Sequence, residues 1–341
     1  MPITKLKLSI LDQSPANDGE TAQDALQNTI KLSQKAEEWG YYRFWVTEHH
    51  GSKRVMGSAP EVLVSHLLAK TSRIRVGSGG VMLQHYSPYK VAENFNVLAS
   101  LAPGRVDLGI GAGPGGMPRS TKALQMNTGY GAKPLADKLD ELQRFLCNSL
   151  DEDHPLYGLT ANPVPPQPAG LFMLGTTPSS AELAAQRGMP YVFALFLNSD
   201  EYVMREAIET YRGLFDGSNG AVSQAILALP VMVAATAEEA QGYASGVKVF
   251  RINLETGRTL TVFSRDAAEE FLNQSLEKGT ITDHEGGVIH GTPTMVRANL
   301  LDLQERYQVG EIIVVTAIPD FQKRLHSYEL LADSIINAPV P

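Results

Sequence analysis

A carboxylate and two imidazoles stand together at Glu48-His49-His50, directly after the short apolar run Arg43–Thr47. A histidine with an ordinary pKa of about 6.5 suits general acid or base catalysis near neutral pH. Two adjacent histidines could also bind a metal ion, but neighbouring side chains of an extended segment point to opposite sides, and no third ligand follows at metal-site spacing. An acid–base role for one of these histidines is therefore one interpretation, and a metal site is not expected. The alternative is a histidine that only hydrogen-bonds the next loop.

A group of hydroxyl side chains lies between a predicted strand and a predicted helix further along the chain. The strand, Leu171–Gly175, ends in a glycine that permits a tight turn, and a helical pattern begins at Ala181. Hydroxyls and free backbone N–H groups at a helix N-terminus favour anions, so phosphate is one interpretation. An ordinary N-cap, which needs a single hydroxyl, is the other. The candidate residues are Gly175, Thr176, Thr177, Ser179 and Ser180.

Two glycine-rich runs follow other predicted strands. Gly77-Ser78-Gly79-Gly80 lies at the end of the third strand, where glycines let the backbone approach a flat ligand closely. A plain flexible turn would use the same residues. The run from Gly111 to Gly116 follows the fourth strand and lacks the pattern of a dinucleotide site, so it is interpreted as a loop.

The elements that must position these residues alternate along the chain. Short apolar runs bounded by Gly, Pro or Ser are typical of buried strands, and amphipathic patterns between them are typical of helices. Strands that alternate with helices indicate parallel βαβ units, and eight such units predict a closed (β/α)8 TIM barrel, whose sites form at the carboxyl ends of the strands. The predicted strands are Leu6–Leu11, Arg43–Thr47, Ile74–Gly77, Val106–Ile110, Leu171–Gly175, Tyr191–Leu197, Ile226–Val233 and Glu311–Thr316.

The domain organisation follows from the same pattern. A doubly wound open sheet is the alternative, but no Gly-x-Gly-x-x-Gly follows the first strand. We expect one barrel domain over residues 1–341, with an insertion after the seventh strand at about residues 234–293. Long connections in compact domains are usually lids or binding loops.

Composition narrows the class of protein. The chain has 341 residues and a net charge of −8, without a block of Lys or Arg, which argues against nucleic acid and anionic membranes as partners. We find no apolar stretch of the roughly 20 residues that a membrane span needs and no signal peptide. The single cysteine, Cys147, excludes a disulfide framework. A cytoplasmic protein is the simplest expectation.

At these junctions the sequence resembles the bacterial-luciferase-like family of flavin-dependent monooxygenases, in its stand-alone single-chain subgroup. The resemblance runs from about Leu8 to Ala332 and depends on many motifs in order. They are Leu11–Pro15, Trp45–His50, Ser58–Glu61, Arg73–Leu83, Pro103–Gly109, Leu174–Thr177, Gly291–Pro293 and Ser327–Ala332.

The resemblance implies a barrel that binds FMN, reduced by a separate flavin reductase, and uses O2 to oxidise a small organic substrate. It also implies a homodimer, to which the apolar stretch Pro60–Ala69 would contribute. Within the family's site, His49 is the matching catalytic histidine. Gly79–Gly80 matches a cis peptide beneath the flavin ring, and Thr177 and Ser180 match the hydroxyls that hold the flavin phosphate.

One position departs from the family pattern. The residue after Gly111, commonly arginine in the family, is Ala112, and we predict that Arg119 supplies the missing charge. Two other functions remain open beside the monooxygenase. One is an F420-dependent oxidoreductase of the same fold, and the other is a non-catalytic FMN-binding flavoprotein. The sequence does not identify the substrate.

Overall fold

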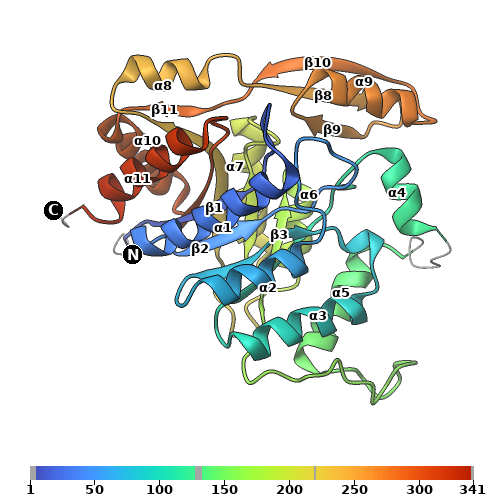
Figure 1. Cartoon of the computed structure of the whole chain (residues 1–341). Coiled ribbons are helices and arrows are strands. Elements are labelled where there is room, and N and C mark those ends of the chain that lie inside the picture. Colours follow the sequence, from blue (N-terminus) through green and yellow to red (C-terminus); the bar gives the residue numbers. More distant parts are fainter. Residues whose placement is uncertain (1–4, 127–132, 219, 339–341) are drawn as a thin grey trace.

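The eight expected strands form a closed parallel barrel in the computed structural model, which describes residues 5–126, 133–218 and 220–338. The order around the barrel is β1 to β6, then β7 and β12, and pairing of β6 with β7 and of β12 with β1 completes the closure. The predicted TIM barrel is therefore confirmed (Figure 1). The barrel strands are β1 Lys7–Asp12, β2 Arg43–Val46, β3 Arg75–Val81, β4 Val106–Gly111, β5 Gly170–Gly175, β6 Tyr191–Ala194, β7 Ala225–Val233 and β12 Glu311–Val315.

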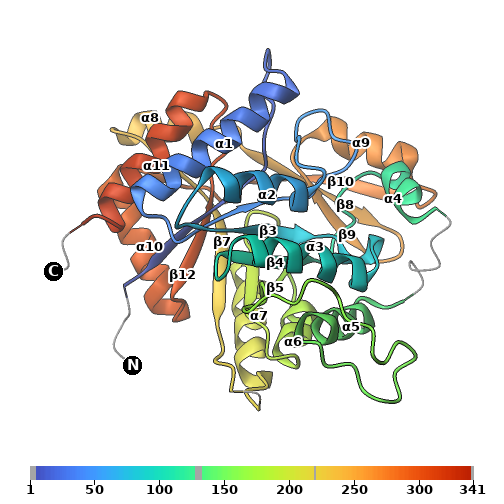
Figure 2. The same ribbon diagram turned by 60° about the horizontal axis from the view of Figure 1, so that its bottom comes forward.

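Helices surround the barrel, and Figure 2 shows the ring from a second direction. Their ends follow local sequence signals. Thr21 and Asp24 form a capping box at the start of the first helix, and Gly40, with a φ of 84°, closes its other end. The helices between barrel strands are α1 Ala22–Trp39, α2 Pro60–Lys70, α3 Pro88–Leu101, α4 Pro118–Gln125, α5 Leu135–Cys147, α6 Pro178–Ala185, α7 Glu201–Leu214 and α10 Pro293–Tyr307; α11 Phe321–Ile335 follows β12.

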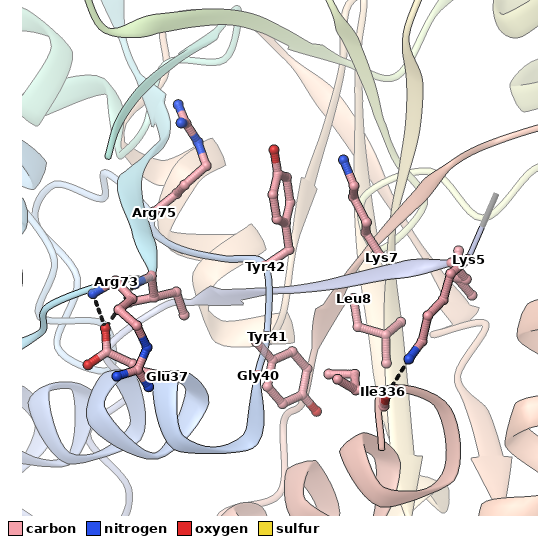
Figure 3. A pocket seen from close by; sticks show the side chains of 12 residues that line it. Lys5, Lys7, Leu8, Glu37, Gly40, Tyr41, Tyr42, Arg73, Arg75 and Ile336 are labelled. Atoms are coloured by element: carbon pink, nitrogen blue, oxygen red, sulfur yellow. Dashed lines mark hydrogen bonds between the residues drawn. The ribbon is translucent and has the colours of Figure 1, made fainter. Parts of the chain in front are cut away.

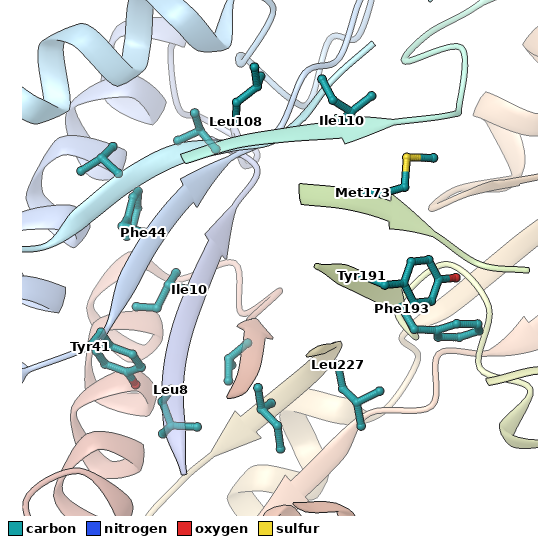
Figure 4. Close-up of a cluster of buried hydrophobic side chains, with 14 of the residues drawn as sticks. Leu8, Ile10, Tyr41, Phe44, Leu108, Ile110, Met173, Tyr191, Phe193 and Leu227 are labelled. Atoms are coloured by element: carbon teal, nitrogen blue, oxygen red, sulfur yellow. The ribbon is translucent and has the colours of Figure 1, made fainter. Parts of the chain in front are cut away.

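Side chains alternate between the two faces of the barrel wall. One set points outward to the helices and forms the larger apolar core, with Leu8, Phe44 and Leu108 among its members (Figure 4). The other set fills the barrel, where the Trp45 and Phe172 rings meet edge to face at 5.1 Å. This alternation decides which residues beyond each strand continue toward the barrel axis.

Charged side chains fill the amino-terminal end of the barrel. The buried Asp107 carboxylate lies 2.7 Å from Arg43 Nη1 and 2.5 Å from Arg75 Nη2, and the Arg43 Nε lies 2.7 Å from Glu311 Oε1. Trp45 Nε1 donates to Asp107 over 3.0 Å. Ion pairs so deeply buried need complete partners, because a lone charge inside the barrel would be costly.

The predicted insertion after β7 contains a small antiparallel sheet of its own, in the order β10-β8-β9. This sheet packs on α9 through Ile252, Leu254, Ala268 and Phe271. Figure 1 shows the sheet and α9 above the carboxyl ends of the barrel strands. The inserted elements are α8 Ala237–Ala244, β8 Lys248–Leu254, β9 Thr259–Val262, α9 Arg265–Gln274, β10 Gly279–Glu285 and β11 Ile289–Gly291, of which β11 pairs with β7.

Several boundaries differ from the sequence-based expectation. Strand β3 continues to Val81, so Ser78, Gly79 and Gly80 lie within the strand and not after it. Strand β6 ends at Ala194, because a turn begins at Leu195 although the sequence stays apolar. Helix α4 lies in a connection that we expected to be a loop, and part of that connection, residues 127–132, is outside the described residues.

None of the helices in the described ranges combines the length and hydropathy that crossing a bilayer requires.

Candidate active site

His49 follows the carboxyl end of β2 and is half-buried. Its backbone N–H donates to the Gly57 carbonyl over 2.7 Å, which fixes the segment beyond the strand. Burial lowers the pKa of the imidazole to about 4, with the neighbouring His50 acting in the same direction and Glu48 against it. His49 is therefore neutral at neutral pH, as a general base or a hydrogen-bonding partner should be.

The neighbouring Glu48 and His50 belong to a hydrogen-bonded group on the other side of this segment. The buried Glu48 carboxylate accepts from the Tyr86 hydroxyl and pairs with His50 Nε2, both at 2.7 Å. Its second oxygen accepts from the Met82 backbone N–H over 3.0 Å. Burial, and then the Glu48 charge, raise the pKa of Tyr86, so that hydroxyl keeps its proton. The group ties the end of β2 to the end of β3.

His50 is thus held by its surroundings, because it contacts Glu48 and forms a backbone bridge with Gly116. The sequence pattern did not identify Tyr86 or Met82 as partners of Glu48. A glutamate before two histidines was a visible signal, but Met82 and Tyr86 lie more than 30 residues from Glu48 in the sequence.

Thr47 adds an unsatisfied polar atom beside His49. It lies two residues beyond Trp45, which faces the barrel interior, and alternation places it on the same side. The threonine is buried, and its hydroxyl has no hydrogen-bond partner among the residues that the structure describes. Buried hydroxyls normally have a partner, so Thr47 is available to a bound ligand.

The glycines of β3 lie beside β4 at the same end of the barrel. A Cβ on Gly79 would come within 2.7 Å of Leu11 Cδ1, and a Cβ on Gly80 within 2.7 Å of the Gly109 carbonyl oxygen. Close packing within the barrel is therefore one reason for glycine at both positions. The peptide bond between Gly79 and Gly80 is cis, as the resemblance led us to expect.

The hydroxyl cluster after β5 caps α6. Thr177 Oγ1 accepts from the Ser180 backbone N–H over 3.3 Å, and the Ser180 hydroxyl donates to the Thr177 carbonyl over 2.7 Å. The Ser180 hydroxyl also lies 2.9 Å from the Tyr191 hydroxyl. The N-cap interpretation is thus correct for Thr177 and Ser180. It does not exclude an anion, because the Thr177 and Ser179 side chains are exposed and the Ser179 N–H, in the first turn, lacks a helical acceptor.

Gly175 and Thr176 complete this loop. A Cβ on Gly175 would come within 2.0 Å of the Ser180 hydroxyl oxygen, so only glycine lets the loop turn so tightly. The Thr176 carbonyl accepts from Asn198 Nδ2 over 3.2 Å, which joins the loops after β5 and β6. Strands β2 and β5 are three places apart in the eight-stranded barrel, so His49 and this loop lie on nearly opposite sides of its mouth.

Arg119 lies at the start of α4 and is exposed. Its backbone N–H donates to Gln274 Oε1 over 3.2 Å, which joins α4 to α9 of the insertion. Within the described ranges we find no hydrogen bond or ion pair between the Arg119 side chain and the loop after β5. Its role toward phosphate stays a prediction.

A cavity of about 530 Å³ opens at the other end of the barrel (Figure 3). Its walls come from the start of β1, the turn before β2 and the start of β3, and they include Lys7, Tyr42 and Arg75. Because barrel enzymes form their sites at the carboxyl ends of the strands, this cavity is separate from the candidate active site. A search of the described residues finds no group of three His, Cys, Asp or Glu side chains arranged to hold a metal ion.

Comparisons with known proteins agree with this arrangement. A sequence profile of luciferase-like monooxygenases matches residues 6–308. The N-acetyl-S-alkylcysteine monooxygenase of Bacillus subtilis (strain 168) is 42% identical over 335 residues, which cover 98% of this chain and 99% of the relative.

Solved structures give the same result. The apo form of MsnO8 superimposes with a TM-score of 0.78 at 34% identity, covering 98% of this chain and 99% of that one. The oxygenating constituent of 3,6-diketocamphane monooxygenase from Pseudomonas putida, solved with FMN, shares the fold with a TM-score of 0.67 at 16% identity, covering 99% of both chains. The chain belongs to the luciferase-like monooxygenase family.

Proposed function

We propose that this protein is an FMN-dependent monooxygenase that takes reduced FMN from a separate flavin reductase and uses O2 to oxidise a small organic substrate. The observation that carries the proposal is the pair of features across the barrel mouth. A neutral histidine lies after β2, and a hydroxyl-rich helix N-terminus lies after β5. The first suits proton transfer at a reacting centre, and the second suits a phosphate.

The residues of the mouth fit a bound flavin mononucleotide. Its phosphate would lie at Gly175–Ser180, with charge from Arg119, and its ring beside Gly79 and Gly80. The unsatisfied Thr47 hydroxyl offers a hydrogen bond toward the barrel axis. Reduced FMN supplies the two electrons that reduce one oxygen atom of O2 to water while the other enters the substrate.

The protein's own groups position and protect the reaction. Neutral His49 accepts a hydrogen bond or a proton at a ring nitrogen, and the Glu48 group holds the segment that carries it. The inserted sheet lies over the strand ends and is bonded to the loop after β6 through Thr261 Oγ1 and the Leu197 carbonyl, at 2.9 Å. Such a cover limits the access of water to the reacting atoms.

For the substrate we propose a thioether of the N-acetyl-S-alkylcysteine class. This step depends on the relative that is 42% identical over nearly the whole chain. Oxidation would add one oxygen atom to the sulfur and release the other as water. A substrate panel with thioethers, aldehydes and ketones tests the class directly.

The central experiment measures product formed per reduced FMN consumed, with a flavin reductase present. Replacing His49 by alanine should lower product formation by about 10²–10⁴-fold, the usual range for a lost general acid or base, and leave FMN binding nearly intact. His326→Ala is a matched control, because His326 is exposed on the outer helix α11.

Three results would contradict the proposal. Wild-type yield in His49→Ala would remove the catalytic role of His49. Binding of F420 in place of FMN by the wild-type protein would favour hydride transfer without O2, and FMN binding without substrate-dependent O2 uptake would favour a non-catalytic flavoprotein.

A further inference from the structure

Arg251 is a half-buried cation of the inserted sheet. It lies in the middle of β8, opposite Thr261 of β9 and Thr282 of β10. Its Nη2 donates to Asn198 Oδ1 over 2.9 Å. In the part of the chain that the structure describes, no carboxylate lies within ion-pair distance of its guanidinium. A guanidinium partly removed from water, with a neutral amide as its partner, favours the arrival of an anion.

The contacts of Asn198 place this cation next to the loop after β5, residues 175–180, which carries the hydroxyl cluster and is called the hydroxyl loop below. Asn198 accepts from Arg251 through Oδ1 and donates through Nδ2 to the Thr176 carbonyl over 3.2 Å. One side-chain amide therefore separates the guanidinium from the backbone of residues 176–180. A second bond, from Thr261 Oγ1 to the Leu197 carbonyl, holds the sheet against the loop after β6, which also carries Asn198. The position of Arg251 is thus fixed from two strands of the sheet.

The hydroxyl loop itself carries no formal positive charge. It offers the exposed hydroxyls of Thr177 and Ser179 and the backbone N–H of Ser179, while Ala112 stands after Gly111 in the loop beyond β4. A dianionic phosphate needs more charge than a helix terminus provides, which is equivalent to roughly half an elementary charge. Arg251 is joined to this loop through the side chain of Asn198, whereas the contact of Arg119 with α9 is through its backbone.

We propose that Arg251 binds the phosphate of the flavin cofactor from above, opposite the α6 N-terminus, and supplies, beside Arg119, the charge that Ala112 does not. This inference rests on the proposed function. It gives the insertion a second task, because the sheet that covers the strand ends also holds the cofactor. Planar guanidinium groups bind phosphate oxygens with two parallel N–H bonds, which the free side of Arg251 permits.

The test compares the dissociation constants of FMN and riboflavin, both reduced anaerobically, for the purified protein. Riboflavin lacks the phosphate, so the ratio of the two constants reports on the phosphate site alone. Arg251→Gln should weaken FMN binding by about 10- to 100-fold and leave riboflavin binding unchanged. Arg258→Gln is the matched control, because Arg258 is an exposed arginine in the turn between β8 and β9 and its replacement makes the same charge change.

A second variant keeps Arg251 but gives it a counter-charge. Asn198→Asp would place a carboxylate against the Arg251 guanidinium, and this variant should also lower the preference for FMN over riboflavin. An unchanged FMN-to-riboflavin ratio in Arg251→Gln overturns the inference, and so does a ratio that falls in Arg119→Gln alone.

If Arg251→Gln keeps the ratio of the FMN and riboflavin dissociation constants but loses affinity for a carboxylate-bearing thioether, Arg251 binds the substrate and the phosphate inference is wrong. A wild-type protein that binds no flavin would refute the proposed function itself, and the inference with it. Equal loss of FMN and riboflavin in Arg251→Gln would show a general disruption of the sheet, which also contradicts a phosphate role.

Discussion

Replacing His49 by glutamine should change how the stability of the protein depends on pH. Burial lowers the pKa of His49 in the folded protein from 6.5 to about 4. The unfolded chain therefore binds a proton below about pH 6.5 that the native protein does not accept until about pH 4, so stability is lost as pH falls through this window. The loss amounts to roughly 2 kcal/mol by pH 5 and about 3 kcal/mol by pH 4, as upper values for a half-buried group.

Glutamine keeps a polar side chain of similar length and cannot titrate, so His49→Gln lacks this contribution. Urea unfolding of both proteins at about pH 7 and about pH 5 gives the comparison. All other groups titrate in both proteins and cancel in the difference. The variant should lose roughly 2 kcal/mol less than the wild type between these two pH values. Parallel pH dependence of the two proteins would show that His49 titrates normally and would refute its assignment as a buried neutral imidazole.

Three further predictions concern the barrel and its surface. Asp107→Asn leaves the buried Arg43 and the half-buried Arg75 short of a counter-charge and should lower the free energy of unfolding by about 3–5 kcal/mol in urea; a loss below about 1 kcal/mol would contradict this. Gly175→Ala places a methyl group against the Ser180 hydroxyl and should destabilise the protein by about 1–3 kcal/mol, measured by thermal unfolding; an unchanged Tm would show that the tight turn does not require glycine. We expect a homodimer by light scattering, and Val62→Asp with Leu101→Asp, which charge exposed apolar positions of α2 and α3, should give the monomer mass; an unchanged mass would exclude this face as the interface.

The barrel was predictable because each strand carries a local signal. Central barrel strands are buried on both faces, so they appear in the sequence as near-continuous apolar runs between turn residues. Strand β3 shows where this signal is insufficient. Its second half, Ser78-Gly79-Gly80, has the composition of a turn, but the packing of Gly79 on Leu11 and of Gly80 on Gly109 makes it a strand. Tertiary contact decides such segments, and composition does not show it.

Some residues of the candidate site could likewise be predicted from the sequence and others could not. His49 and the hydroxyls at Thr177 and Ser180 were predictable because they directly follow strand signals, and barrel geometry places such residues at the mouth. The partners of Glu48 were not, since Tyr86 lies 38 residues away and reaches the carboxylate only once β2 and β3 are paired. Arg251 lies still further from the residues that it approaches, in a segment that the sequence identified only as an insertion.

The insertion connects these observations. Its sheet is bonded to the loop after β6 by Thr261 and Arg251, and its apolar cluster packs against Met117 of the loop after β4. The loops after β4 and β6 thus contact the same inserted sheet. A ligand that orders this sheet at one of the two loops therefore also restrains the other loop. If Arg251 holds the flavin phosphate, cofactor binding would stabilise the sheet over His49, and the site would exclude water only when the cofactor is present. Hydrogen exchange of the β8 and β9 amides with FMN and with riboflavin would separate this coupling from simple ring binding, because only the phosphate-bearing ligand should slow exchange there.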